Sequence, residues 1–390
     1  MLQLQCNSSS IARYDFRNEI MNVVFYLDDL FGGGVQRRTM RLLQGIKDND
    51  HNDELNVHLI VNQPGGENKA MVPTQVSYHT LNGVTGSQHT KALGEMLTAL
   101  RPDIVVCCMG QQFIQALKHK ASLPKACRWY VIQAVPVKLI AYSWLRNKIR
   151  EIGIRKFYPK ADKVLCVSDD VRATVAQLSS SLDELAHTIY NPVVSENLLT
   201  LSQEPVEHPF FDSGNIVLVA AGRLNVQKDY GTMLDAFALL TAKHPERSFK
   251  LLILGDGELR EQVSSQIQRL GIDDNVDLVG FTDNPYKYIS RADLFVMSSL
   301  WEGLPNAMIE SLAIGKPVVS TECVAGPREI LLDGSLGTLV PMQDPQAFAD
   351  GIISELQQSR DKQALQARGW EFSVNNAANK YIKLFKDAKL

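Results

Sequence analysis

The stretch IVLVAAGRLNVQKDYG, residues 216–231, decides the fold of this 390-residue chain. It begins with five apolar residues, Ile216–Ala220, reaches a glycine at Gly222 and passes into a helical pattern at Gly231. A short, continuously apolar strand is typical of a parallel sheet that is covered by helices on both faces. The stretch therefore predicts one strand–loop–helix unit of a doubly wound α/β domain.

The same alternation of short apolar runs and longer helical patterns occurs along the chain in two sets. Besides Ile216–Ala220, the predicted strands are Asn22–Leu27, Val57–Val61, Val76–His79, Ile104–Cys107, Trp129–Ile132, Val164–Val167, Leu251–Leu254, Val276–Val279, Leu294–Met297, Val318–Ser320 and Thr338–Val340. Helical patterns such as Gly231–Lys243 and Leu259–Leu270 supply the crossovers. We therefore expect an α/β protein of two facing, doubly wound, Rossmann-like domains with an interdomain cleft for ligands.

The boundaries of the two domains follow from where the alternation stops. Residues 1–20 lack a long apolar core and precede the first strand, so they are predicted to be a poorly ordered extension. Residues 21–195 and 196–370 then form the two domains. A segment that contains prolines and a glycine, about 191–214, is predicted to join them.

Composition excludes several classes of protein. The chain has 40 Lys and Arg against 43 Asp and Glu, a net charge of −3 that is too balanced for a general nucleic-acid coat. No apolar run approaches the roughly 18 residues of a membrane span. No Cys/His cluster has the spacing of metal ligands, so the sequence predicts neither a metal nor a cofactor. Unpaired cysteines within apolar runs fit a reducing cytoplasm.

The first segment that carries chemistry is Gly32–Gly34, directly after the first predicted strand. Glycines let the backbone approach a ligand closely, and the N–H groups of Gly33 and Gly34 would meet an anion at the start of the next helix. The segment is not G-x-G-x-x-G, and the second strand ends in Val61-Asn62 without the acidic residue that binds a dinucleotide ribose. A nicotinamide-dependent dehydrogenase is therefore disfavoured. The alternative for these glycines is a plain tight turn.

A second segment places two cations after the strand Ile216–Ala220. Arg223 and Lys228 flank a loop that opens a helix, with Asp229 as its expected N-cap. Two cations here would bind a diphosphate and stabilise its charge as it departs, whereas the alternative is a solvated surface pair. A similar strand and glycine turn recurs at Gly257, where the glycine serves either a ligand or only packing.

The strongest motif is WEGLPNAMIE, residues 301–310. Glu302 lies in the loop before a predicted helix, and Glu310 lies on the second turn of that helix. The two carboxylates are too far apart in sequence for one metal or a shared proton, so they suit two separate hydroxyl clusters, such as the two sugars of a nucleotide sugar. The amides of Asn306 and Ala307 would meet the phosphates between these sugars. The alternative is two solvated glutamates.

The segment 137–163, VKLIAYSWLRNKIREIGIRKFYPKADK, is strongly basic. Leu145, Ile149 and Ile152 fall at helical spacing beside Trp144. This pattern is typical of a basic, aromatic-edged helix that contacts an anionic membrane surface or a lipid diphosphate. A solvated basic face explains the same residues.

Together these segments resemble the family-4 retaining glycosyltransferases of the GT-B fold. Glu302 and Glu310 match the E-x7-E element of that family, and Arg223 and Lys228 match its Arg/Lys pair. Gly32–Gly34 match its first glycine loop. The resemblance extends over nearly the whole chain after residue 21.

The resemblance implies a role for each of these residues. Arg223 and Lys228 would hold the donor diphosphate, Glu310 the ribose hydroxyls and Glu302 the transferred sugar, so that Arg223, Lys228 and Glu302 are the catalytic candidates. Phe281, in the turn Gly280-Phe281, would border the base. The full set of donor-binding candidates is Gly33, Gly34, Gly257, Phe281, Leu304, Asn306, Ala307 and Glu310.

Two further expectations come from the resemblance. Many relatives carry a histidine after the strand that corresponds to Trp129–Ile132, and Gln133 takes that position here as an acceptor or sugar contact. Residues 371–390 are similar to the terminal helix of the family, which crosses back to the first domain.

The implied activity is retaining transfer of a hexose or N-acetylhexosamine in the synthesis of a bacterial surface polysaccharide. The segment Thr321–Leu332 points to a UDP-activated donor, and the acceptor would be a glycan or an undecaprenyl-diphosphate-linked glycan. The enzyme would act in the cytoplasm, with contact to the inner face of the membrane through residues 138–163, and without nucleic acid or metal. Two rival functions stay open: a sugar-nucleotide epimerase of the same fold, and a non-catalytic subunit that binds a UDP-sugar.

Overall fold

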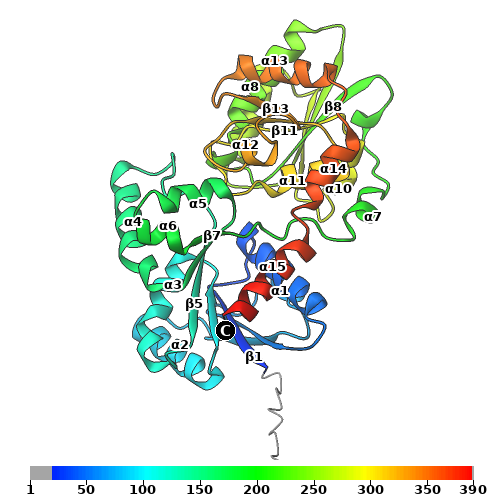
Figure 1. The fold of residues 1–390 in the computed structure, drawn as a ribbon. Helices are drawn as coiled ribbons and strands as arrows, with labels where there is room; N and C mark the ends of the chain where they lie inside the picture. The colour runs from blue at the N-terminus through cyan, green and yellow to red at the C-terminus, as the bar shows by residue number, and fades with distance from the viewer. Residues whose placement is uncertain (1–19, 389–390) are drawn as a thin grey trace, which may run out of the picture.

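The computed structural model describes residues 20–388, which form two α/β domains stacked one above the other (Figure 1). The predicted extension, apart from Ile20, lies outside the described residues. Each domain has a parallel sheet with helices on both of its faces, and this confirms the predicted fold class.

The N-terminal sheet has seven strands within the described residues, in the order β3-β2-β1-β4-β5-β6-β7. These strands are β1 (Met21–Leu27), β2 (Leu55–Val61), β3 (Ser77–Thr80), β4 (Ile104–Cys107), β5 (Arg128–Gln133), β6 (Lys163–Cys166) and β7 (Ala186–Thr188). The helices of this domain are α1 (Gly34–Asn49), α2 (Gly86–Leu100), α3 (Gly110–Ala116), α4 (Trp144–Phe157), α5 (Asp169–Ala176) and α6 (Ser180–Leu185).

The C-terminal sheet has six strands in the described part of the chain, in the order β10-β9-β8-β11-β12-β13. These strands are β8 (Asn215–Ala221), β9 (Ser248–Leu254), β10 (Val276–Gly280), β11 (Leu294–Met297), β12 (Val318–Thr321) and β13 (Thr338–Val340). The remaining helices are α7 (Leu198–Ser202), α8 (Tyr230–Lys243), α9 (Arg260–Leu270), α10 (Tyr286–Arg291), α11 (Asn306–Ile314), α12 (Pro327–Ile330), α13 (Pro345–Gln357), α14 (Lys362–Trp370) and α15 (Val374–Asp387).

Every predicted strand is present, with boundaries that shift by at most a few residues. Sequence reasoning missed one strand, β7, which pairs with β6 at the edge of the first sheet. The sequence of β7 is Ala186-His187-Thr188, which has no apolar run, so only its pairing with β6 identifies it as a strand.

The strand order reverses once in each sheet, between β1 and β4 and between β8 and β11. At such a reversal the loops after the two strands diverge and leave a crevice at the carboxyl ends. The loop after β1 carries Gly32–Gly34, the loop after β8 carries Arg223 and Lys228, and the loop after β11 carries Glu302. The topology therefore places the three motifs at reversal points.

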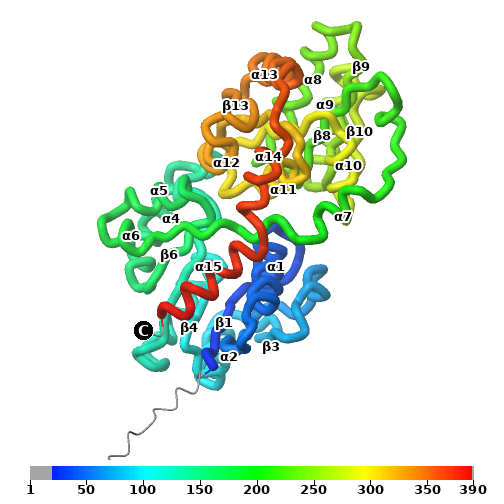
Figure 2. Tube along the Cα trace, turned by 45° about the vertical axis from the view of Figure 1, so that its right-hand side comes forward, coloured from blue at the N-terminus to red at the C-terminus, as the bar shows by residue number. Residues whose placement is uncertain are grey.

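The chain crosses between the domains twice, at the linker before α7 and again just before α15. Figure 2 shows α15 leaving the upper domain and lying along α1 of the lower one. The Phe372 carbonyl accepts hydrogen bonds from the amides of Val193 (2.9 Å) and Val194 (3.1 Å), so the two crossings are joined to each other. Gly45 of α1 allows the close approach, because a Cβ there would lie 2.6 Å from the Val374 side chain.

Phe385 anchors α15 in the N-terminal core. Its side chain is fully buried, with ring centroids 6.2 Å from Phe25 of β1 and 6.3 Å from Tyr130 of β5. The last helix of the chain therefore closes the core of the first domain.

Replacing this ring tests that arrangement. Phe385→Ala should lower the free energy of unfolding of the N-terminal domain by about 3–5 kcal/mol, because it removes a buried aromatic side chain and leaves a cavity. The measurement is urea denaturation followed by circular dichroism. Lys383→Ala, at an exposed position of the same helix, is the control. Equal stabilities of the two variants would contradict the packing of α15.

Candidate functional site

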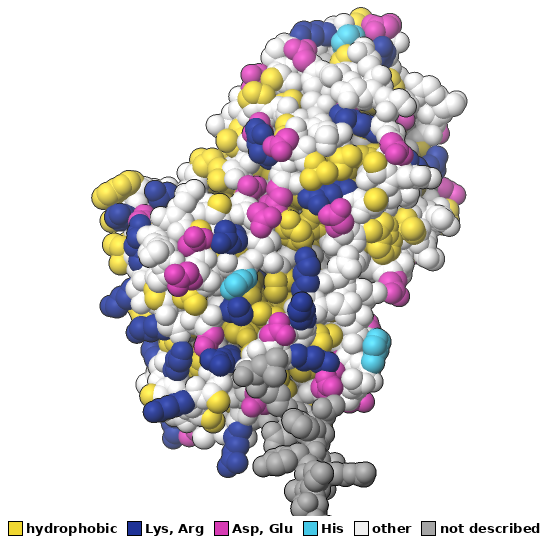
Figure 3. All heavy atoms as spheres, viewed as in Figure 1, with side chains coloured by type: hydrophobic (Ala, Val, Ile, Leu, Met, Phe, Trp, Pro, Cys, Tyr) yellow, Lys and Arg dark blue, Asp and Glu magenta, His cyan; other side chains and the backbone are white. Residues whose placement is uncertain are grey.

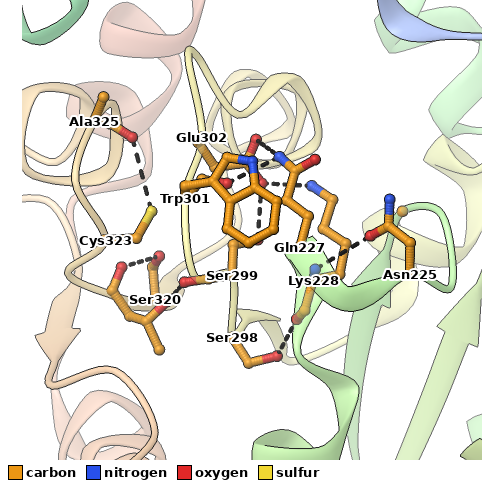
Figure 4. A network of polar contacts seen from close by, with 12 residues as sticks. Asn225, Gln227, Lys228, Ser298, Ser299, Trp301, Glu302, Ser320, Cys323 and Ala325 are labelled. Carbon is orange, nitrogen blue, oxygen red and sulfur yellow. Dashed lines mark hydrogen bonds and ion pairs between the residues drawn. The ribbon is translucent and has the colours of Figure 1, made fainter. Parts of the chain in front are cut away.

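A buried ion pair lies where the loops after β8 and β11 meet (Figure 4). The Nζ of Lys228 is 2.6 Å from Oε1 of Glu302, and Glu302 is only 6% exposed. The hydroxyl of Ser299 donates to the same oxygen (2.8 Å), and Nε2 of Gln227 donates to Oε2 (3.2 Å). A ligand therefore meets Lys228 with its charge already neutralised by Glu302.

The backbone around Lys228 is held by hydrogen bonds from its own loop and from the loop after β11. The side chain of Asn225 accepts from the Lys228 amide (3.3 Å), and the Ser298 hydroxyl donates to the Lys228 carbonyl (2.7 Å). Asp229, at φ +45°, caps α8 by accepting from the Thr232 amide, as the sequence predicted. The β8 and β11 loops are thus bonded along their length and hold the ion pair between them.

Gly257, after β9, packs against the backbone of the loop that carries Arg223 and Lys228. A Cβ at residue 257 would overlap the carbonyl oxygen of Leu224, and one at Gly255 would overlap the carbonyl oxygen of Gly222. The Leu224 carbonyl also accepts a hydrogen bond from the amide of Leu259. Close backbone packing therefore accounts for the glycine at 257, and its contact with the donor stays a prediction.

Arg223 differs from Lys228 in having no counter-ion. Its side chain is exposed, and within residues 20–388 it has no hydrogen-bond or ion-pair partner. It reaches the other domain: a Cβ at Gly32 would lie 3.6 Å from its Nη2. Of the two predicted cations, Arg223 is therefore the one that is available to an anion.

The first glycine loop lies beside that guanidinium. The Gly32 amide donates to Oε2 of Glu67 (2.7 Å), so it is not available to a ligand. Gly33, at φ +74°, is the N-cap of α1, and the described chain supplies neither a capping side chain nor an acidic residue in the first turn of that helix. The amides of Gly33 and Gly34 thus keep the capacity to bind an anion.

Glu310 is held from the other domain. Its Oε1 lies 3.2 Å from Nη1 of Arg41 in α1 and accepts from the hydroxyl of Tyr286 (3.0 Å). Arg41 also donates to the Val193 carbonyl (2.7 Å) and to the Tyr286 hydroxyl (3.1 Å). Burial lowers the pKa of Arg41, but Glu310 and Tyr286 outweigh burial and raise that pKa, so the guanidinium stays charged.

Sequence reasoning missed Arg41 and Tyr286. Neither belongs to a motif: Arg41 lies inside a helix, more than 260 residues before Glu310, and only the tertiary structure brings them together. Burial and the nearby Glu310 carboxylate raise the pKa of the Tyr286 phenol, so it remains a hydrogen-bond donor.

Phe281 follows β10 and exposes 61% of its surface. The guanidinium of Arg37, from α1, lies 5.4 Å from the centre of its ring, a cation–π contact across the two domains. An exposed aromatic ring at this place can stack on a planar ligand.

The start of α11 carries the remaining donor candidates. Asn306 and Ala307 are its first residues, and the described chain provides no side-chain cap and no acidic group in its first turn. Oδ1 of Asn306 is buried and accepts no hydrogen bond from the described residues. Leu304 instead turns into the apolar core, so its side chain contributes packing.

Gln133, at the end of β5, has both polar groups in internal bonds. Its Nε2 donates to the Val135 carbonyl (2.6 Å), and its Oε1 accepts from the Tyr158 hydroxyl (2.7 Å). The predicted contact with an acceptor or sugar would require these bonds to break.

Residues 20–388 contain neither a metal-binding cluster nor a membrane-spanning helix. The described chain contains no group of three or more His, Cys, Asp or Glu that could hold a metal ion. Among its helices, none has the length and apolar character to cross a membrane.

Both halves of the chain match models of known families. Residues 32–197 match Glycosyltransferase Family 4, and residues 203–370 match Glycosyl transferases group 1. The chain therefore belongs to the family-4 glycosyltransferases of the GT-B fold, as its motifs indicated.

Relatives of this chain include several named glycosyltransferases. An uncharacterized glycosyltransferase of Methanocaldococcus jannaschii is 36% identical over 189 residues, which is 48% of this chain and 46% of that protein. The N-acetylgalactosamine-N,N'-diacetylbacillosaminyl-diphospho-undecaprenol 4-alpha-N-acetylgalactosaminyltransferase of Campylobacter jejuni is 30% identical over 62% of both chains. The chain thus spans about half to three fifths of these relatives. Another Campylobacter jejuni alpha-1,4-N-acetyl-D-galactosaminyltransferase matches at 24% identity over 95% of this chain and 99% of its own.

Solved structures share the fold. Anabaena HepE in complex with UDP and glucose has a TM-score of 0.73 at 17% identity, covering 94% of this chain and 100% of its own. The galactosyltransferase WaaB in its apo form has a TM-score of 0.72 at 19% identity, covering 95% of this chain and 100% of its own. At these identities the likeness establishes the architecture alone.

The buried pair at Lys228 and Glu302 gives a test that does not depend on activity. Lys228→Met should lower the free energy of unfolding of the C-terminal domain by about 3–5 kcal/mol, because Glu302 is left as a buried charge without a partner. Combining Lys228→Met with Glu302→Gln should restore most of that loss, because no charge then stays buried. Urea denaturation measures both effects.

Lys243→Met is the matched control, because Lys243 forms a more exposed pair with Asp350 in the same domain. An equally small effect of both lysine variants would argue against a buried, neutralising pair.

Proposed function

We propose that the protein is a retaining glycosyltransferase that moves a hexose or N-acetylhexosamine from a UDP-sugar to a glycan or an undecaprenyl-diphosphate-linked glycan. The observation that carries this proposal is the position of Arg223. Its guanidinium has no partner among residues 20–388 and lies at the carboxyl end of β8, beside the glycine loop of the other domain. An anion that binds there lies between the two lobes.

The proposed chemistry is charge stabilisation on a departing diphosphate. The bond between the sugar C1 and the phosphate oxygen breaks first, and the sugar becomes oxocarbenium-like. Arg223 and the first amides of α11 stabilise the charge that grows on the diphosphate. The acceptor hydroxyl forms the new bond to C1 on the same face, and its proton passes to the departing phosphate.

Lys228 has a conditional part in this scheme. Its ammonium is paired with Glu302, so it acts on the diphosphate only if the bound sugar draws the Glu302 carboxylate into hydrogen bonds with its hydroxyls. The same shift would give Glu302 its role with the transferred sugar. A metal is not required in this proposal, because side-chain cations and helix amides neutralise the charge on the diphosphate.

Transfer activity should therefore persist when EDTA is added to the assay.

The donor and acceptor are proposed from the relatives. Structures of the same fold are complexes with UDP or UDP-glucose, and two relatives are named for diphospho-undecaprenol or PP-undecaprenol substrates. Glu310 is proposed to bind the ribose hydroxyls through Oε2, since Oε1 is held by Arg41 and Tyr286.

A panel of UDP- and GDP-sugars, incubated with and without a lipid-linked glycan, separates the alternative functions. An epimerase would convert the sugar without an acceptor, and a binding subunit would bind UDP without turnover.

Arg223→Ala is the direct test of this proposal. It should lower kcat/KM for transfer by about 10²–10³-fold, as expected when one preorganised donor to a developing anion is removed. The measurement is UDP release in the presence of the acceptor that the panel identifies.

Arg247→Ala is the matched control, because Arg247 is an exposed arginine at the opposite end of the same sheet. Transfer that is unchanged in Arg223→Ala would refute the assignment of charge stabilisation to this side chain.

We further propose that α4 contacts an anionic membrane. Trp144 and Ile149 are 77% and 61% exposed, and Leu145, Ile149 and Ile152 lie on one face of the helix. Figure 3 shows apolar and basic side chains interleaved along the outer edge of the N-terminal domain, where α4 lies. Of the basic residues, Lys148 and Arg155 pair with Glu151, whereas Lys156 and Lys160 are exposed without a carboxylate partner in the described chain.

The membrane proposal is tested by sedimentation with lipid vesicles. The wild type should bind vesicles of phosphatidylglycerol and phosphatidylethanolamine more strongly than vesicles of phosphatidylcholine alone, because the free lysines favour anionic lipid. Ile149→Ser should lower that binding about tenfold through lost apolar burial. Leu199→Ser, at an exposed leucine on α7, is the control. Equal binding to both vesicle types, or none, would contradict the proposal.

A further inference from the structure

The loop that carries Glu302 is docked on the N-terminal domain by its next residue, Gly303. The buried hydroxyl of Ser168 donates to the Gly303 carbonyl (2.8 Å). On its other side Gly303 packs against the backbone after β5, because a Cβ at residue 303 would overlap the carbonyl oxygen of Ala134. The backbone next to Glu302 is therefore positioned by the opposite domain.

A second contact lies beside the first. Glu329 of α12 accepts hydrogen bonds from the first two amides of α5: Oε1 from Asp169 (3.0 Å) and Oε2 from Asp170 (3.2 Å). In return, Oδ2 of Asp170 accepts from the amide of Gly326, the N-cap of α12 (2.9 Å). Each helix start thus has its open amides capped by a carboxylate from the other domain.

These contacts meet at one element. Ser168 is the N-cap of α5, where its Oγ accepts from the Val171 amide (3.2 Å) while it donates to Gly303. The start of α5 therefore holds both the loop after β11 and the turn before α12. We define Ser168, Asp170, Gly303 and Glu329 as the α5 seam.

The α5 seam can exist only when the domains are closed, since each of its bonds joins the two domains. On opening, the α5 amides and the Glu329 carboxylate return to water, so each bond contributes only a small net free energy. Such an equilibrium is easily shifted by a single substitution. In the closed form, burial between the domains raises the pKa of the Glu329 carboxyl group.

We propose that Ser168 and Glu329 are positioning residues that hold the domains closed and set the backbone of Glu302 against the acceptor side. Neither side chain touches the proposed donor; each acts through the loop or helix that it holds. This inference rests on the proposed transfer reaction for its effect on rate, but not for its effect on closure.

The test compares Glu329→Ala, Ser168→Ala and Glu329→Gln. Glu329→Ala should lower kcat for transfer about tenfold, the effect of losing roughly one or two net hydrogen bonds. The dissociation constant for UDP, measured by calorimetry, should change less than about threefold, because the residues proposed to bind the nucleotide all remain. Glu329→Gln keeps one acceptor oxygen and should recover part of the rate.

Closure itself is read by small-angle X-ray scattering. Glu329→Ala and Ser168→Ala should each increase the radius of gyration of the ligand-free protein. Two control variants remove the same kinds of group, a carboxylate and an N-cap hydroxyl, away from the α5 seam. Glu322→Ala removes a carboxylate that pairs with Arg328 inside the C-terminal domain. Ser179→Ala removes an equivalent N-cap, that of α6, away from the seam.

The outcomes separate this inference from the proposed function. An increase in radius of gyration in the seam variants supports the inference even if no transfer is found for the wild type, in which case the proposed function alone fails. If the seam variants have the same radius of gyration and the same kcat as the two control variants, the inference is overturned. A fall in melting temperature with no change in kcat or in radius of gyration also overturns it, since that is a structural role alone. If Glu329→Ala does not fold, Ser168→Ala decides by the same readings.

Discussion

The candidate site depends on one buried interaction, the ion pair between Lys228 and Glu302. It forms where the strand order of the second sheet reverses, so each charge comes from a loop that the fold leaves free at a carboxyl end. Two opposite charges can stay buried there because each neutralises the other, and Ser299 and Gln227 donate hydrogen bonds to the carboxylate. The pair also ties the loop after β8 to the loop after β11. The position of Gly303, and with it the docking on the first domain, follows from this tie.

The charged side chains of the candidate site differ in where their counter-ions come from. Glu302 is neutralised within its own domain, whereas Glu310 is neutralised by Arg41 from the other domain. Arg223 has no partner among the described residues and lies at the boundary of the two domains. The site thus presents the open guanidinium of Arg223 together with two neutralised pairs, which suits an elongated ligand with an anionic centre and a hydroxyl-bearing group at each end. A nucleotide sugar has this form.

Much of the fold could be read from local sequence, and the reason is physical. Strands buried on both faces need continuous apolar runs, and such runs identified every predicted strand. Strand β7 was not predicted, because a three-residue strand at a sheet edge needs no apolar pattern. The N-cap was recognisable for a similar reason, because Asp229 accepts from the Thr232 amide only three residues further on. The need for a glycine at 257 is not local, because a Cβ there would overlap the Leu224 carbonyl of another loop.

The sequence by itself determined the two α/β domains and the strand-end loops that carry the cations, carboxylates and glycines of the candidate site. It did so because strand burial, helix starts and tight turns depend on neighbours in the chain. Only the tertiary structure decided which charges are neutralised: Lys228 by Glu302, and Glu310 by Arg41. It also decided that Arg223 has no partner among the described residues and that Ser168 and Glu329 each bond to the opposite domain. Pairing between distant residues is set by how the sheets and helices pack, and no local pattern records it.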